Sequence, residues 1–225
     1  MYYYLLLVVP ALLVTAWAQY KVKSTFSKYS QYATASGMTG QAASQLIQSA
    51  NGIRVAVGPV AGELTDHYDP RTNEIRLSEP VYANSSISAV GVAAHETGHA
   101  LQYAQNYAPI RFRMALVPIT NFSASVSPYL IMFGLLAGMD ALSYIGIALF
   151  SVAVLFQLVT LPVEFNASRR AVTALRASGQ FTAGELDGVQ KVLFAAAMTY
   201  VAALLVSVMN LLRLVLVVAG RRRRN

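Results

Sequence analysis

Four apolar runs alternate with two polar segments along the chain. The runs are residues 1–20, 114–139, 141–163 and 192–220. Each reaches the roughly 20 residues that a helix needs to cross a bilayer. Asp140 alone separates the two middle runs, which predicts a tight transmembrane hairpin. The first run has aromatic residues at both ends and no basic residue before it, which indicates a transmembrane helix rather than a signal peptide.

The polar segments, residues 21–113 and 164–191, hold most of the charged side chains. Turn and capping signals within the first of them predict short helices and strands. The predicted elements are a helix over Thr39–Ala50, strands over Ile53–Val57, Leu64–Tyr68 and Glu74–Leu77, and a helix from Ile87 to Tyr107 with Pro109 as its stop. The turn residues at 69–73 predict a hairpin between the last two strands.

The composition supports a membrane protein. The chain has 225 residues, of which 56% are hydrophobic and only 12% are charged. Soluble domains carry about 25% charged residues, so the composition disfavours a soluble globular monomer, and the high hydrophobicity excludes intrinsic disorder. The predicted fold is an α+β integral membrane protein, mostly helical, with a small β-hairpin or sheet and three or four transmembrane helices.

The expected organisation follows from the runs. It consists of an N-terminal transmembrane helix (1–20), a first polar part (21–113), a transmembrane hairpin (114–163), a second polar part (164–191), a C-terminal apolar helix (192–220) and a basic tail (221–225). Three lysines follow the first run, and by the positive-inside rule they place the polar parts on the cytoplasmic side of the plasma membrane.

The tail conflicts with this orientation. A fourth crossing would put Arg221–Arg224 outside, against the positive-inside rule. Either the last run does not cross, or the larger number of basic residues in the polar parts outweighs the tail. The sequence leaves both possibilities open.

The basic excess indicates membrane contact. The net charge is +7, but the basic residues are concentrated in the tail and beside the apolar runs. This distribution is typical of anchoring at a lipid surface, and we expect no nucleic-acid partner. The chain has no cysteine, so any metal ion must be held by His, Asp or Glu.

One short motif carries recognisable chemistry. His95 and His99 are four positions apart on a predicted helix, with Glu96 between them. That spacing puts two imidazoles on one helix face, where they can share a metal ion, and leaves the carboxylate free to take a proton from water. This is the arrangement of a zinc hydrolase, with one Zn²⁺ per chain. An isolated HExxH also occurs by chance on amphipathic helices, but these are two of only three histidines in the chain.

A catalytic zinc site needs a third protein ligand. The acids after the motif are Asp140, Glu164, Glu185 and Asp187. Asp140 lies in the far turn of the predicted hairpin, whereas Glu164 follows directly where the hairpin returns. Geometry therefore favours Glu164. Asp187 remains the alternative, because Leu186-Asp187-Gly188 is similar to a segment of site-2-type intramembrane proteases.

Several stretches resemble the bacterial membrane-bound neutral zinc metallopeptidase family, distantly similar to the heat-shock and CAAX-processing membrane zinc proteases. They are LTDHYDP (Leu64–Pro70), EIRLS (Glu74–Ser78), VAAHETGHALQ (Val92–Gln102) and LPVEFNASRRA (Leu161–Ala171). The similarity extends from about Gly37 to about Ala202. It implies a zincin-like catalytic domain of the gluzincin type, with His95, His99 and Glu164 as ligands and Glu96 as general base.

One position departs from the related proteases, which tend to carry Glu-x-x-Ala-Asp at the third ligand. Here Ser168 stands in the place of the Asp that supports a ligand. Residues of this kind orient metal-bound histidines. We expect Ser168 to do this weakly, or another acid such as Asp66 to replace it.

Other residues are candidates for lesser roles. His67, Tyr103 and Tyr200 could support a transition state, although a structural role is the commoner one for each residue type. The strand Glu74, Ile75, Arg76, Leu77, Ser78 is a candidate edge strand that pairs with substrate backbone.

The sequence thus predicts a membrane-anchored zinc metalloendopeptidase that hydrolyses membrane or membrane-proximal polypeptides beside the lipid bilayer. A non-catalytic zinc-binding membrane scaffold and a site-2-type intramembrane protease are the alternatives. A zinc transporter is disfavoured, because the apolar runs carry no paired His or carboxylate. Nothing in the sequence indicates an oligomeric state.

Overall fold

The computed structural model describes residues 2–222 of the chain. It is an α+β membrane protein, as the sequence predicted: mostly helical, with a small three-stranded sheet. The helices are α1 (Val9–Ser30), α2 (Gly40–Ala50), α3 (Glu79–Tyr82), α4 (Ile87–Ala104), α5 (Ala108–Ala137), α6 (Asp140–Ala177) and α7 (Ala183–Arg222), and a π-helical stretch, Tyr4–Val8, precedes α1. The strands are β1 (Ala56–Val60), β2 (His67–Asp69) and β3 (Glu74–Ser78).

Within residues 2–222, four helical segments are long and apolar enough to cross a membrane. They are Tyr4–Ser30, Ala108–Ala137, Asp140–Ala177 and Ala183–Arg221. The chain divides into two compact units. We call Met1–Gln19, Arg111–Pro162 and Thr199–Asn225 the apolar unit, and Tyr20–Ile110 and Val163–Met198 the polar unit.

The apolar unit is organised around the α5–α6 hairpin. Gly138 makes the turn with a φ of 73°, a conformation that glycine adopts without a steric penalty. Small residues let the two helices approach closely: a Cβ at Gly134 would lie 2.5 Å from the backbone N of Ser143. A Cβ at Gly146 would lie 2.9 Å from the backbone N of Ile131. Such contacts replace the hydrophobic driving force that is absent between helices in lipid.

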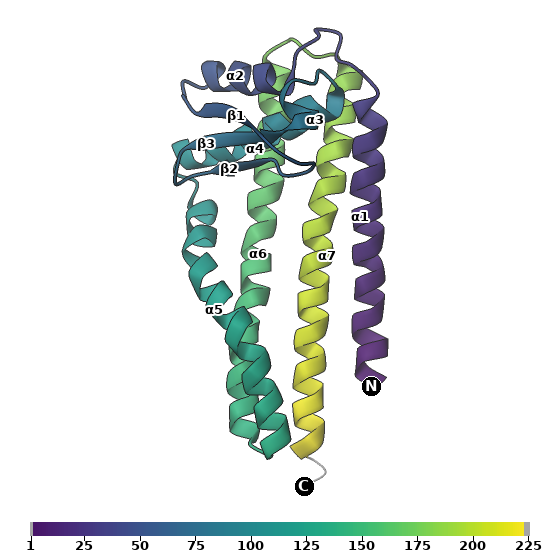
Figure 1. Ribbon diagram of the computed structural model, residues 1–225, viewed down its shortest axis with the longest axis vertical. Helices are drawn as coiled ribbons and strands as arrows, with labels where there is room; N and C mark the ends of the chain where they lie inside the picture. The colour runs from purple at the N-terminus through teal and green to yellow at the C-terminus, as the bar shows by residue number, and fades with distance from the viewer. Residues whose placement is uncertain (1, 223–225) are drawn as a thin grey trace. The chain divides into compact units, whose positions relative to one another are not determined.

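The polar unit is a sheet and a set of helices packed on α4. The strands lie side by side in the order β1-β3-β2, with β1 parallel and β2 antiparallel to β3, and α4 passes behind them in Figure 1. Buried Ile75, Leu77 and Val81 pack against Ala89 and Ala93 of α4. A second core joins α4 to α2 and to the parts of α6 and α7 that belong to this unit.

A capped N-terminus and a buried polar contact hold α4 in the centre of the polar unit. Its N-cap is Ser86, whose Oγ accepts a hydrogen bond from Ala89 N. Thr97, buried in the helix interior, approaches Ser44 of α2 with 2.7 Å between their hydroxyl oxygens. Twelve of the residues between Ile87 and Ala100 are among those buried, so α4 is the central helix of the unit.

The hairpin prediction for β2 and β3 is confirmed, but the strand boundaries differ. β1 lies at Ala56–Val60 rather than Ile53–Val57. Ile53 N donates to the carbonyl oxygen of Gln48, and Val55 N donates to Gln48 Oε1, so this stretch is held to the end of α2 as a loop. Pro59 is tolerated in β1 because β1 is an edge strand.

Two further predictions need correction. β2 begins at His67 rather than Leu64, because Leu64 has a φ of 57° and breaks the extended conformation. α4 ends at Ala104 rather than Tyr107, and Asn106 follows it with a φ of 55°. Pro109 does not stop α4. It occupies the first turn of α5, where its missing N–H costs nothing.

Candidate metal centre

α4 presents His95 and His99 on one face. Their ring centroids lie 4.8 Å apart with the planes at 83°. Both side chains are largely buried, and both Nε2 atoms point to the same carboxylate on another helix. The helical spacing of four residues is the local cause of this convergence.

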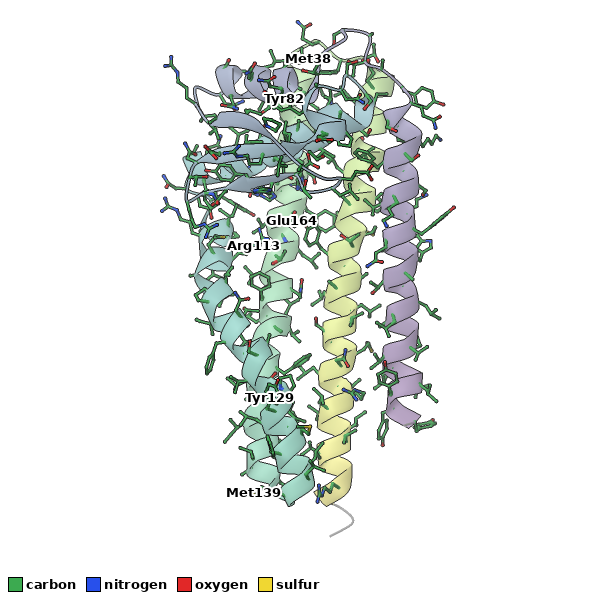
Figure 2. All side chains as sticks on the ribbon, in the orientation of Figure 1. Met38, Tyr82, Arg113, Tyr129, Met139 and Glu164 are labelled. Atoms are coloured by element: carbon green, nitrogen blue, oxygen red, sulfur yellow. The ribbon has the colours of Figure 1, made fainter. Side chains whose placement is uncertain are left out.

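That carboxylate belongs to Glu164 on α6 (Figure 2). Glu164 Oε2 lies 3.3 Å from His95 Nε2 and 3.6 Å from His99 Nε2. Glu164 is 2% exposed. Among residues 2–222, these three side chains form the one group of His, Asp and Glu with ligand atoms within 4.8 Å of one another.

The spacing of the donor atoms suits a tetrahedral ion. Zinc binds nitrogen and carboxylate oxygen at about 2.1 Å, which puts neighbouring ligands of a tetrahedron about 3.4 Å apart. The two nitrogen–oxygen distances, 3.3 Å and 3.6 Å, lie on either side of that value. Two imidazoles and one carboxylate form the donor set of many catalytic zinc sites, which leave a fourth position open.

The family follows from the comparisons. A family model described as "Putative neutral zinc metallopeptidase" matches residues 4–219. The chain belongs to this family. It is also similar to the "Putative membrane protease YugP" of Bacillus subtilis (strain 168), with 49% identity over 223 residues that cover 99% of each chain. No solved structure matches the chain. The resemblance found in the sequence is therefore confirmed, and membership of a zinc peptidase family implies zinc.

The charge of Glu164 acts on the histidine beside it. Burial alone would lower the pKa of His99, but the hydrogen bond and the negative charge of Glu164 outweigh it, with a smaller contribution from Glu96. The net effect raises the pKa of His99 above its usual range. Without a metal ion, a proton on this ring neutralises the buried carboxylate. A metal cation in the same place would do so more strongly.

Each histidine has a partner for its other ring nitrogen. His95 Nδ1 lies 3.1 Å from Ser168 Oγ, and His99 Nδ1 lies 3.1 Å from Gln102 Oε1. Such hydrogen bonds leave Nε2 as the nitrogen that can bind a metal. Ser168 therefore contacts a predicted ligand from the position where related proteases carry Asp. Asp66 does not replace it, because its carboxylate accepts hydrogen bonds from Ser78 N and Oγ.

Gln102 is a site residue that the sequence analysis missed. Its Nε2 donates to the carbonyl oxygen of Val163 at 2.8 Å and to Asn166 Oδ1 at 3.0 Å. Gln102 thus ties the helix of the two histidines to the turn of α6 that carries Glu164. Its position three residues after His99 was the available signal, since residues at that spacing share a helix face.

Close backbone contact reinforces this link. A Cβ at Gly98 would lie 2.5 Å from the carbonyl oxygen of Ala167 on α6. Only glycine fits without moving one of the helices. The glycine in the middle of the motif therefore fixes the distance between the two histidines and Glu164.

The other predicted acids lie outside the group. Asp187 is more than half exposed and forms an ion pair with Lys191. The carboxylate of Glu185 accepts hydrogen bonds from Ala35 N and Thr182 N. Asp140 begins α6 in the apolar unit. None of these is placed with His95 and His99, so the site-2-type alternative has no support in the structure.

The predicted supporting residues are scattered. His67 is exposed, and its Nδ1 lies 2.7 Å from the carbonyl oxygen of Thr65. The Tyr103 ring contacts Tyr68 of β2, with 5.5 Å between centroids. Tyr200 belongs to the apolar unit. A role for these three residues in supporting a transition state stays a prediction.

The edge-strand prediction is wrong. β3 is the central strand and pairs with β1 on one side and β2 on the other. Its backbone groups are used within the sheet, so Glu74–Ser78 is not free to pair with a substrate. The position of the strand in the sequence was predicted correctly, but its pairing with β1 was not. A parallel partner strand leaves no signal in the local sequence.

Proposed function

We propose that this chain is a membrane-anchored zinc metalloendopeptidase that hydrolyses membrane or membrane-proximal polypeptides. The observation that carries the proposal is the convergence of His95, His99 and Glu164 from two helices, with donor spacings suited to zinc. Glu96 follows His95 directly on α4 and is buried beside the group. This combination of ligands and adjacent carboxylate is what peptide-bond hydrolysis by a zinc enzyme requires.

The residues of the chain take distinct roles in this proposal. Bound zinc would supply a Lewis acid that polarises the scissile carbonyl and lowers the pKa of water. The Glu96 carboxylate takes a proton from the attacking water and passes it to the leaving amine. Ser168 and Gln102 hold the imidazoles in the orientation that presents Nε2.

The proposed location follows from chain continuity. Glu164 lies two residues after Pro162, the last residue of that part of the apolar unit, in one unbroken helix. At 1.5 Å per residue, that is about 3 Å along the helix axis. A ligand so close to the apolar run favours a substrate at or near the lipid surface. We place the polar unit on the cytoplasmic side of the plasma membrane from its flanking lysines.

A non-catalytic zinc scaffold is the competing interpretation, based on Ser168 in place of Asp. The Ser168 hydroxyl lies within hydrogen-bond distance of His95, so the supporting contact is retained. The intact Glu96 also argues against a scaffold.

The test is the isosteric change Glu96→Gln in detergent-purified protein. We expect one zinc per chain by atomic absorption in both wild type and variant, and cleavage of unfolded casein by the wild type alone. Loss of the general base costs at least about 100-fold in rate. Glu63→Gln, the same change in an exposed loop residue, is the control and should retain both properties. Zinc-loaded wild type that cleaves neither casein nor membrane polypeptides would support the scaffold.

A further inference from the structure

A groove runs between α6 and α7 within the polar unit, where the two helices lie side by side (Figure 1). Its volume is about 330 Å³. We call it the arginine groove, because two arginines, Arg169 and Arg176, line one side of it. Phe165, Leu193 and Phe194 supply the apolar part of the lining. The groove therefore combines cations with an aromatic surface.

The two arginines have no anionic partner. They are seven positions apart on α6, which is two helical turns and about 10 Å along one face. Both are exposed, and within residues 2–222 neither forms an ion pair or a side-chain hydrogen bond. Guanidinium groups bind phosphate oxygens in a bidentate manner. Two of them at this spacing can converge on one phosphate from either side.

The neighbouring arginine shows the contrast. Arg170 donates from Nε to Asn166 Oδ1 at 2.7 Å, donates to Gln105, and lies over the Tyr107 ring. Its guanidinium is thus used within the polar unit. Arg169, one position earlier, lines the groove and has no such partner within residues 2–222. Arg169 and Arg176 are therefore the unpaired cations that line the groove.

The apolar part of the groove has exposed aromatic rings. Phe165 is 38% exposed and Phe194 is 61% exposed. Both lie within five residues of the points where α6 and α7 continue as the apolar runs of candidate membrane spans. Along α6, the order from Arg176 through Arg169 to Phe165 is cation, cation, apolar. A phospholipid has the same order, with its phosphate followed by its acyl chains.

We propose that the arginine groove binds an anionic phospholipid, with its phosphate on Arg169 and Arg176 and an acyl chain along Phe165 and Phe194. Ser168 also lines the groove, and its hydroxyl is the one beside His95 Nδ1. The bound lipid therefore lies next to a hydrogen bond that orients a proposed zinc ligand. The lipid site itself does not depend on the protease activity.

The experiment uses the full-length chain, purified and delipidated in detergent. Equimolar phosphatidylglycerol and phosphatidylcholine of identical chain length are added, and bound lipid is counted by native mass spectrometry. A basic residue near a membrane contributes about 1 kcal/mol, or about a fivefold preference for anionic lipid, so two such residues should give a preference of about 25-fold. Glycerol 3-phosphate in excess should compete poorly, because it lacks the chain.

Variants locate the site. Arg169→Gln with Arg176→Gln should abolish the preference for phosphatidylglycerol, and each single change should reduce it about fivefold. The control is Arg54→Gln with Arg71→Gln, which removes the same charge from exposed positions elsewhere in the polar unit and should keep the preference. Zinc content and thermal midpoint check that each variant is folded. If the double Gln variant is not folded, Arg169→Lys with Arg176→Lys keeps both charges and should retain most of the preference for phosphatidylglycerol.

Three results would overturn the proposal. Wild type could bind the two lipids equally, or the arginine variants could keep the full preference. Complete displacement by glycerol 3-phosphate would indicate a site for soluble phosphate compounds rather than for lipid.

Discussion

At the scale of single residues, the serine at position 168 determines how strongly one imidazole is held. A hydroxyl can accept a hydrogen bond from His95 Nδ1, but it carries no charge, and hydrogen bonds to a carboxylate are about twice as strong. Gln102 is likewise neutral toward His99. Both histidines are therefore oriented by uncharged groups, and Glu164 supplies the negative charge at the centre of the site.

Zinc content of ligand variants tests the assignment of Glu164. Glu164→Ala should lose most of the bound zinc, because it removes the buried carboxylate that faces both imidazoles. Asp187→Ala should bind zinc like the wild type, since Asp187 is exposed and paired with Lys191. Equilibrium dialysis with atomic absorption gives both values. Normal zinc in the first variant together with loss in the second would make Asp187 the ligand.

The raised pKa of His99 predicts how pH acts on the metal-free protein and on the zinc-bound one. A pKa raised above 6.5 on folding contributes stability that is fully present below about pH 6.5 and lost as pH rises through the folded value. Zinc needs the neutral ring, so the stabilisation by zinc should increase with pH. We expect the shift in thermal midpoint on adding zinc to grow between pH 5.5 and 8. A shift that is constant over this range would contradict a role for His99 in binding.

At the scale of elements, the packing of α4 on α6 sets the metal geometry. Gly98 brings the backbones together, and Gln102 adds hydrogen bonds to Val163 and Asn166 one turn later. The contact lies between the two elements that carry the ligands, so it determines the nitrogen–oxygen distances directly.

Gly98→Ala tests this contact. The new Cβ would be 2.5 Å from the Ala167 carbonyl oxygen and must push the helices apart, which we expect to cost about 1–3 kcal/mol of stability and to weaken zinc binding. Gly184→Ala is the matched control. Position 184 is also helical but has no neighbour within 4 Å, so alanine there should be neutral or slightly stabilising. Thermal unfolding and zinc titration of both variants provide the measurement, and equal behaviour would exclude a spacing role for Gly98.

At the scale of the whole molecule, the chain passes between its apolar and polar units within continuous helices. α6 begins in the apolar unit and continues without interruption into the polar unit. α7 begins in the polar unit and continues into the apolar unit. On the proposed topology, the four candidate spans determine on which side of the membrane the polar unit lies.

Because the chain has no cysteine, introduced cysteines can test the proposed cytoplasmic location of the polar unit directly. Met139, exposed at the turn of the α5–α6 hairpin (Figure 2), and Glu63, exposed in a loop of the polar unit, are each changed to Cys. In intact cells an impermeant maleimide should label Met139→Cys, whereas Glu63→Cys should react only after lysis. The cysteine-free parent is the blank. The reverse labelling pattern would place the polar unit outside the cell.

Local patterns in the sequence were sufficient for the helices and for part of the site. The HExxH spacing predicted the convergence of His95 and His99, and the scarcity of acids made Glu164 the favoured partner. The contacts of Gln102 and Gly98 could not be predicted, because they depend on how α4 packs on α6. The parallel pairing of β1 with β3 was missed for a similar reason: Gly58 and Pro59 resemble a strand terminator, and the pairing is non-local.

The clustered side chains come from two distant parts of the chain, because Glu164 lies 69 positions after His95. All of α5 and the first two thirds of α6 lie between them. During synthesis the two histidines are therefore made first, as an incomplete half-site. The carboxylate can join them only after the hairpin has been translated and inserted. On our proposal, a newly made or wrongly inserted chain is inactive, and hydrolysis begins only once the protein has assembled in its membrane.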